Sequence, residues 1–195
     1  MDINDSIQHI GLPATIIRTS GNITTYAAIR PIAKAASYSS MPFEREGMFP
    51  TTSGVVKGDL ILFDDLYYLV VNARRQNTAG DYLMDRVRLF ECNHIVTVKN
   101  QDETTKAWVV KTSSVPCLII SQSDRANIAT DRSVILKDYR GQDAGYVLFC
   151  QSTAGIDRKS RIIDENNVPL SVTGNVDPYF VNGLIEVQVK IERPG

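Results

Sequence analysis

Residues 54–99 read GVVKGDLILFDDLYYLVVNARRQNTAGDYLMDRVRLFECNHIVTVK, and this stretch decides the fold. Short apolar runs alternate in it with turn-forming residues: residues 60–63 stop at two aspartates, and residues 66–71 carry the chain back. A polar tip follows at 74–80, and residues 82–98 return as a strand pair or as one bent strand. The stretch therefore predicts a meander of β-strands, and it carries no set of side chains suited to covalent chemistry.

The rest of the chain extends this pattern. Residues 14–30 predict a hairpin, and residues 2–10 predict a short amphipathic helix. In residues 184–192, Ile185, Val187, Val189 and Ile191 alternate with Glu186, Gln188, Lys190 and Glu192, so the first set is expected inside and the second in water. The fold class is all-β, with one or two small β-barrels or sandwiches and a short N-terminal helix. The strands expected after residue 106 are 107–111, 116–121, 133–137, 146–151, 161–164, 168–173 and 184–192.

Composition divides the chain into two predicted domains. Residues 100–106 (NQDETTK) are the most polar part of its middle, and they predict a linker between a domain at 1–99 and a second at 107–195. Both domains end on a long strand with alternating charges, which is a weak internal similarity. Residues 37–53 carry two prolines, one glycine and no periodicity, and predict a long functional loop.

Bulk properties exclude several classes of function. A net charge of −1 over 195 residues argues against a duplex-binding protein, which would carry a strongly basic face. The three cysteines are scattered, which favours thiols in a reducing compartment over disulfides or a structural zinc site. The first residues lack the pattern of a signal peptide, and no apolar run is long enough to span a bilayer. We therefore expect synthesis in a cytoplasm and no membrane partner.

Potential reactive groups have ordinary structural explanations. His94 has Cys92 nearby but no further ligand at a metal-site spacing, so a structural histidine is expected. The adjacent carboxylates Asp64 and Asp65 are turn residues first, because aspartate favours turns and neighbours on a strand point to opposite faces. We predict no catalytic, cofactor-binding or metal-binding residues and no enzyme. A small β-barrel hydrolase, with carboxylates or histidine at one barrel mouth, is the alternative.

Aromatic residues leave another alternative open. Tyr67, Tyr68 and Trp108 are suited to a carbohydrate- or ligand-binding module, although core packing is the more frequent role of such residues in strands. In the 37–53 loop, large apolar side chains either tuck under the domain or dock on another chain. The predicted partner-interface residues are Met41, Phe43, Arg45, Met48 and Phe49 in that loop, with Arg74 and Arg75 at the polar tip, where plain solvation is the alternative.

The order of these segments resembles a protein family. The hairpin at 14–30, a loop, then GDLILF at 58–63, YLVV at 68–71 and the strand pair at 82–98 resemble small β-barrel proteins of tailed bacteriophages. These proteins form the neck between the capsid portal and the tail, and include head-closure, head-tail connector and tail-completion proteins. Residues 161–192 resemble their C-terminal half.

The resemblance implies a structural virion protein. Copies would form a homo-oligomeric ring that adjoins a portal or adaptor protein and tail proteins, in the neck or tail of a virion assembled in the host cytoplasm. DNA would be retained by this ring and would pass through its lumen without specific binding, as suits a chain of nearly zero net charge. A baseplate, tail or capsid-decoration protein is the alternative within the same class.

Overall fold

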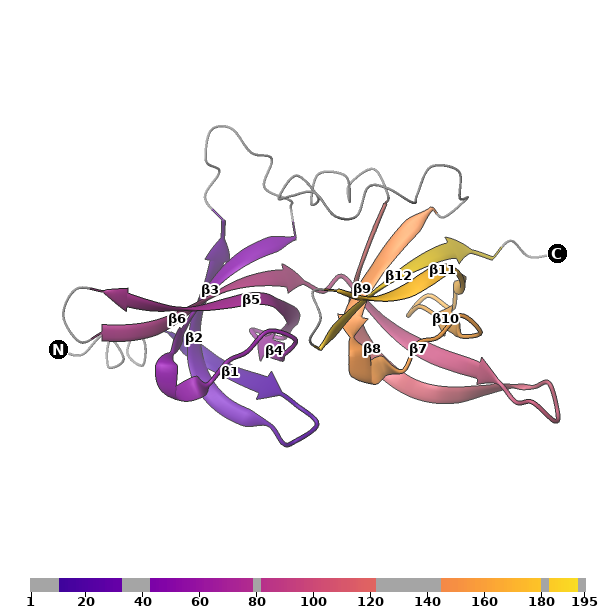
Figure 1. Cartoon of the computed structure of the whole chain (residues 1–195), viewed down its shortest axis with the longest axis horizontal. Helices are drawn as coiled ribbons and strands as arrows, with labels where there is room; N and C mark the ends of the chain where they lie inside the picture. Colours follow the sequence, from indigo (N-terminus) through magenta and orange to yellow (C-terminus); the bar gives the residue numbers. More distant parts are fainter. Residues whose placement is uncertain (1–10, 33–42, 79–81, 122–144, 180–182, 193–195) are drawn as a thin grey trace. The chain divides into compact units, whose positions relative to one another are not determined.

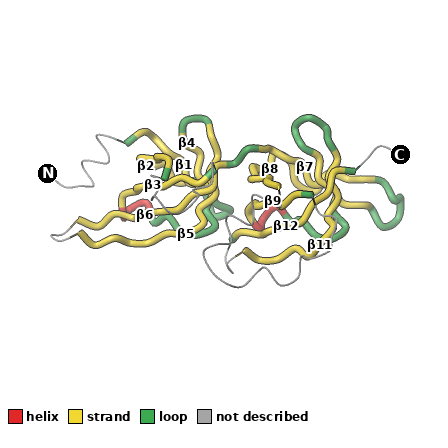
Figure 2. Tube along the Cα trace, turned by 90° about the horizontal axis from the view of Figure 1, so that it is seen from above, coloured by secondary structure: helices red, strands yellow, loops and turns green. Residues whose placement is uncertain are grey.

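The computed structural model describes residues 11–32, 43–78, 82–121, 145–179 and 183–192. In this part of the chain, twelve strands and two 3-10 turns form two units, Met1–Cys92 and Asn93–Gly195 (Figure 1). Strands make up most of the trace in Figure 2, and the two 3-10 turns are its red segments. The all-β prediction is confirmed, and each unit is a closed six-stranded barrel. The predicted helix at 2–10 lies outside the described residues.

The first barrel closes through pairing of its first and fourth strands. Its sheet order is β1-β2-β3-β6-β5-β4, and β1 also pairs with β4. The predicted hairpin at 14–30 is present as β1 and β2. The interior is filled by one cluster of buried side chains that includes Ile16, Phe49, Ile61 and Leu89. The strands are β1 (Leu12–Ile17), β2 (Ile23–Pro31), β3 (Glu44–Pro50), β4 (Leu60–Phe63), β5 (Leu66–Thr78) and β6 (Tyr82–Glu91).

The second barrel repeats the topology of the first. Its sheet order is β7-β8-β9-β12-β11-β10, and β7 also pairs with β10, so β7 to β12 correspond in order to β1 to β6. Its core includes Val98, Leu148, Ile162 and Val187. The strands are β7 (His94–Gln101), β8 (Trp108–Ser121), β9 (Tyr146–Gln151), β10 (Arg161–Ile163), β11 (Pro169–Tyr179) and β12 (Leu184–Ile191).

The repeat extends to local detail. A 3-10 turn joins the third strand to the fourth in each barrel, η1 (Thr51–Ser53) and η2 (Ser152–Ala154). Each turn ends at a glycine with positive φ, 59° at Gly54 and 68° at Gly155, a conformation that glycine adopts without a steric penalty. The weak similarity between the two halves is therefore part of a complete structural repeat: the chain is two tandem copies of one barrel.

The domain boundary differs from the predicted one. The first unit ends at Cys92, and β7 pairs with β8 and β10 of the second barrel. The predicted linker at 100–106 is the tip of the β7–β8 hairpin, closed by the bond from the Asp102 N–H to the Ala107 carbonyl at 2.8 Å. Thr104 and Thr105 donate their N–H groups to the Asp102 side chain. The polarity of this segment reflects an exposed hairpin and not a junction between domains.

The predicted loop at 37–53 is partly a strand. Residues 33–42 lie outside the described residues, but 44–50 form β3, which pairs with β2 and β6. Gly47 lies in the middle of this strand, and a Cβ there would approach side-chain atoms of Phe49 and Val87 at 2.8 Å. Gly47 and Pro50, which suggested a loop, therefore belong to a tightly packed strand.

The predicted alternation in residues 184–192 is only partly correct. Val187 and Val189 point into the core, as expected. Ile191, expected inside, is 42% exposed, whereas Glu186 and Gln188, expected in water, are buried. The alternation fails because part of β12 is covered on both faces, and a strand covered on both faces loses its inside-outside signal.

The β4–β5 turn offers a direct test of its backbone geometry. Asp64 (φ 50°) and Asp65 (φ 59°) form a two-residue hairpin loop with both residues in the left-handed region, which favours Asn-Gly. Replacing the pair by Asn-Gly should raise the free energy of unfolding by about 1 kcal/mol, measured by urea denaturation. Asp64→Asn alone should give a smaller gain. A loss of stability in the double variant would contradict this turn geometry.

Candidate functional site

The described members of the predicted interface set differ in burial. Phe49 is fully buried in the core of the first barrel, so it tucks under the domain and does not dock on a partner. Its neighbour Met48 is half-buried, and Phe43 is partly buried just before β3. Arg74 lies exposed on β5. Met41 and the side chain of Arg75 lie outside the described residues.

The charged residues of β3 tie together three strands of the first barrel. Glu46 lies between Arg30 of β2, at 2.8 Å, and Arg86 of β6. Hydrogen bonding to Arg86 lowers the pKa of Glu46 despite partial burial, and Arg30 adds to the effect. Arg45, a predicted interface residue, forms an ion pair with Glu91 at 2.7 Å. The two arginines favour the charged form of Glu46, so this side chain stabilises strand pairing and is poorly suited to proton transfer.

Another ion pair fixes the connection between η1 and β4. The side chain of Asp59 is only 5% exposed. It accepts a hydrogen bond from Arg18 Nε at 2.6 Å and forms an ion pair with Arg18 Nη2. It also accepts a hydrogen bond from the Val56 N–H at 2.8 Å. Arg18 also donates to the Gly54 carbonyl at 2.7 Å, next to the left-handed turn. One arginine therefore joins the end of β1 to both ends of this connection.

The second barrel has an uncharged pair at the same position. Ser160 donates its hydroxyl to Asn100 Oδ1 at 2.8 Å and accepts the Asp157 N–H at 2.9 Å. Lys111 supplies the cation that contacts the glycine carbonyl, from Nζ to the Gly155 oxygen at 2.7 Å. The two barrels thus satisfy the same backbone groups with different side chains, which marks these contacts as structural.

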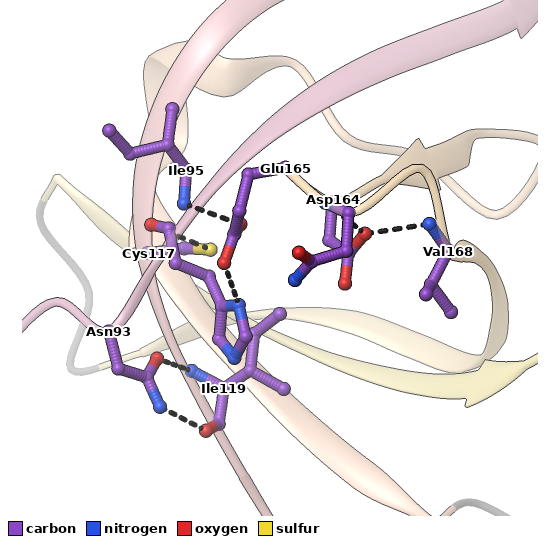
Figure 3. Close-up of polar contacts among 9 residues, drawn as sticks. Asn93, Ile95, Cys117, Ile119, Asp164, Glu165 and Val168 are labelled. Atoms are coloured by element: carbon purple, nitrogen blue, oxygen red, sulfur yellow. Dashed lines mark hydrogen bonds and ion pairs between the residues drawn. The ribbon is translucent and has the colours of Figure 1, made fainter.

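His94 connects the start of the second barrel to the β10–β11 turn. Its Nδ1 lies 2.8 Å from Glu165 Oε1, and Glu165 Oε2 accepts the Ile95 N–H at 3.2 Å (Figure 3). Asn93 binds both the N–H and the carbonyl of Ile119 at 2.8 Å, beside this contact (Figure 3). His94 therefore has a structural partner.

The side chains considered for a metal site or for the alternative hydrolase lie on different elements of the described chain. Among them, no three His, Cys, Asp or Glu side chains come together in a way that could hold a metal ion. Asp64 and Asp65 belong to an exposed turn of the first barrel, and His94 is paired with Glu165 in the second. None of the three cysteines forms a disulfide, and burial raises the pKa of Cys150 to about 12, so its thiol stays protonated.

The Glu165 contacts predict a pH effect on stability. Partial burial disfavours the anion, but the hydrogen bonds from its backbone, His94 and Ile95 outweigh it and place the pKa of Glu165 below its ordinary value of 4.5. The charged form thus stabilises the fold above that value, and the contribution is lost as the pH falls through the folded pKa. Because Glu165 is 43% exposed, solvent screens the effect to less than about 1 kcal/mol.

Thermal unfolding between pH 3 and pH 7 measures this contribution. The melting temperature of Glu165→Gln should be lower than that of the unmodified protein at pH 7, and the difference should shrink towards pH 3. Glu103→Gln, which changes an exposed carboxylate at the β7–β8 tip, is the matched control and should leave the profile unchanged. A pH-independent difference for Glu165→Gln would contradict the assignment.

A pocket of about 440 Å³ opens beside the β7–β8 hairpin, and the sequence did not single it out. Its lining includes Trp108, Lys106, Arg158, Lys159, Glu103 and Glu192. Trp108 is 40% exposed, so the expectation of core packing is wrong for it, whereas Tyr68 is in the core and Tyr67 is partly buried. The one available signal was the position of Trp108, two residues after the end of the polar stretch at 100–106.

Among the described residues, no helix has the length and apolar character needed to cross a membrane. The chain matches no protein-family model, no curated protein and no solved structure. Its function can therefore be inferred only from the fold and from the contacts among its described residues.

Proposed function

We propose that the chain is a structural protein of a tailed-phage virion and forms part of the ring that joins the portal to the tail. The supporting observation is the duplicated, closed barrel, in which charged side chains brace strands and turns. Arg18 with Asp59, and Glu46 with Arg30 and Arg86, are contacts of this kind. Closed barrels of this kind are suited to binding other protein subunits through their outer surfaces. The resemblance of residues 58–71 and 82–98 to neck proteins gives the proposal its specific place in the virion.

The barrel architecture also limits how copies associate. Closure removes the open sheet edges through which strands of different chains would pair. Contacts between copies therefore use side chains and connecting segments, and repeated head-to-tail contacts of this kind form a ring when the rotation between neighbouring copies closes. A net charge of −1 suits a lumen through which DNA passes without being held. A baseplate, tail or capsid-decoration role would use the same properties at another position.

Native mass spectrometry of the full chain over a range of concentrations, alone and with portal and tail proteins, tests this proposal. We expect rings of defined size that form with increasing concentration or on addition of a partner. Arg74→Glu, at an exposed predicted interface residue, should weaken assembly, whereas Lys159→Glu, an exposed charge reversal on the second barrel, should not. A monomer under all conditions, including reconstitution with portal and tail, would remove the proposal.

A further inference from the structure

Because the two barrels share one topology, residues at equivalent positions can be compared directly. Residues that are present only in the second barrel are not needed to form the barrel itself. In the first barrel, Leu60 begins β4 and is buried, whereas Arg161 begins the corresponding strand β10. The N–H of Cys92 bonds to the Tyr67 carbonyl at 2.8 Å, and Glu192 makes the matching bond to the Pro169 carbonyl at 2.9 Å. Arg161 and Glu192 therefore stand at positions that the same scaffold fills with a leucine and a cysteine.

These two residues meet a third that the first barrel also lacks. The β7–β8 hairpin runs past the barrel to the pair Gln101 and Trp108, whereas the corresponding β1–β2 ladder ends at the pair Ile16 and Ile23. The Arg161 guanidinium lies over the Trp108 ring, 5.5 Å from its centroid, and forms an ion pair with Glu192 at 2.5 Å. The Arg161 guanidinium thus contacts one face of the indole, while 40% of Trp108 is exposed.

Trp108 forms part of the wall of the 440 Å³ pocket, a volume in the range of about 300 to 1,000 Å³ in which proteins hold small ligands. The wall carries as many basic as acidic side chains, together with polar groups of Gln101, Ser160 and Ser171. The bases are Lys106, Arg158 and Lys159, and the acids are Asp102, Glu103 and Glu192. Hydrogen-bond donors and acceptors are therefore interspersed around one exposed aromatic ring.

We propose that this pocket is a binding site for a neutral saccharide. A sugar ring presents hydroxyl groups that both donate and accept, which matches a wall of interspersed bases, acids and amides. Its C–H face carries a partial positive charge that stacks on the negative face of an indole. Single-stranded nucleic acid would also stack on Trp108, but it requires a consistently positive groove, and three carboxylates line this one. The proposal is independent of the structural role proposed above.

The chain contains a single tryptophan, so tryptophan fluorescence, excited at a wavelength where the tyrosines do not absorb, reports on this pocket alone. The full chain is first screened on an array of neutral and acidic glycans. It is then titrated with the neutral glycans that bind, with maltotriose, cellotriose, tri-N-acetylchitotriose and lactose, and with an eight-residue oligothymidylate. We expect a saturable change in Trp108 emission with at least one neutral glycan, and protection of the indole from quenching by acrylamide.

Calorimetric titration of variants locates the site. Trp108→Ala should weaken saccharide binding roughly tenfold or more, while Trp108→Phe, which keeps an aromatic face, should retain part of it. Tyr26→Ala is the matched control, because Tyr26 lies on the first barrel and is exposed to a similar extent, 42%. The Tyr26→Ala variant should bind the saccharide with unchanged affinity. Circular dichroism and the melting temperature confirm that each variant is folded. An array with no bound neutral glycan, saccharide binding that survives Trp108→Ala, or a fluorescence response only to the oligothymidylate would each overturn the proposal.

Discussion

Replacing Phe49 by alanine should lower the free energy of unfolding by about 3 to 5 kcal/mol. The phenyl ring is fully buried, and it packs in the core of the first barrel with Val87 and Leu89. It also lies against Gly47, which has no side chain to move into the vacated space. The substitution thus removes buried apolar surface and leaves a cavity. Urea denaturation followed by circular dichroism measures the loss.

Met48→Ala is the matched control for this substitution. Met48 is the neighbour of Phe49 on β3, and it is only half-buried, so we expect a loss of about 1 kcal/mol or less. A Phe49→Ala protein of unchanged stability that no longer assembled with partners would contradict the core assignment. Phe49 would then belong to an interface, as one reading of the sequence has it.

Asp59→Ala should cost about 3 kcal/mol of stability. The substitution leaves the Arg18 guanidinium and the Val56 N–H without their shared acceptor, at a side chain that is 5% exposed. The second barrel suggests how to repair this loss, because Asn100 and Ser160 occupy the same positions without charge. The double variant Arg18→Asn with Asp59→Ser should therefore recover part of the stability that Asp59→Ala loses.

The second barrel provides the control for this experiment. Ser160→Ala removes hydrogen bonds to Asn100 and to the Asp157 carboxylate but no charged side chain, so it should cost about 1 to 2 kcal/mol, less than Asp59→Ala. Equilibrium unfolding of the four proteins gives the comparison directly. If Asp59→Ala were as stable as the unmodified chain, or if the double variant were less stable than Asp59→Ala, the two positions would not be equivalent.

Most of the strands could be predicted from the sequence, because the local pattern specifies them. Leu60–Phe63 and Tyr146–Gln151 are bounded by turn residues on both sides, and both are present as predicted. The sequence left barrels and sandwiches open, because closure depends on the pairing of β1 with β4 and of β7 with β10. Such pairing joins segments that are far apart in the chain, and no local sequence pattern in either segment indicates it.

Errors in the prediction arose where tertiary packing overrides local signals. Gly47 and the prolines near it suggested a loop, but the glycine is required because Phe49, Val87 and Leu89 crowd its position in β3. Residues 100–106 suggested a linker because an exposed hairpin tip has the same polar composition as a domain junction. The sequence similarity between the two barrels is also weak, because the second barrel has the same backbone topology as the first but different side chains. Asn100 and Ser160, for example, occupy the positions of Arg18 and Asp59.

The candidate saccharide site could not be predicted because its members come from separate elements. Trp108 begins β8, Arg161 begins β10 and Glu192 follows β12, so only the closed barrel brings them together. Aromatic residues in strands are more often core residues, so there was no reason in the sequence to expect an exposed Trp108 side chain. Comparison of the two barrels supplied the missing signal, since it separates residues that the scaffold needs from residues that it does not.

Electron microscopy of phage particles labelled with antibody to this chain tests the central claim most directly. The proposed role predicts label at the junction between capsid and tail, in a constant number of copies per particle. Label on the capsid surface or the baseplate would move the protein to another structural position. Particles that assemble complete necks and carry none of the chain would contradict a role in the neck.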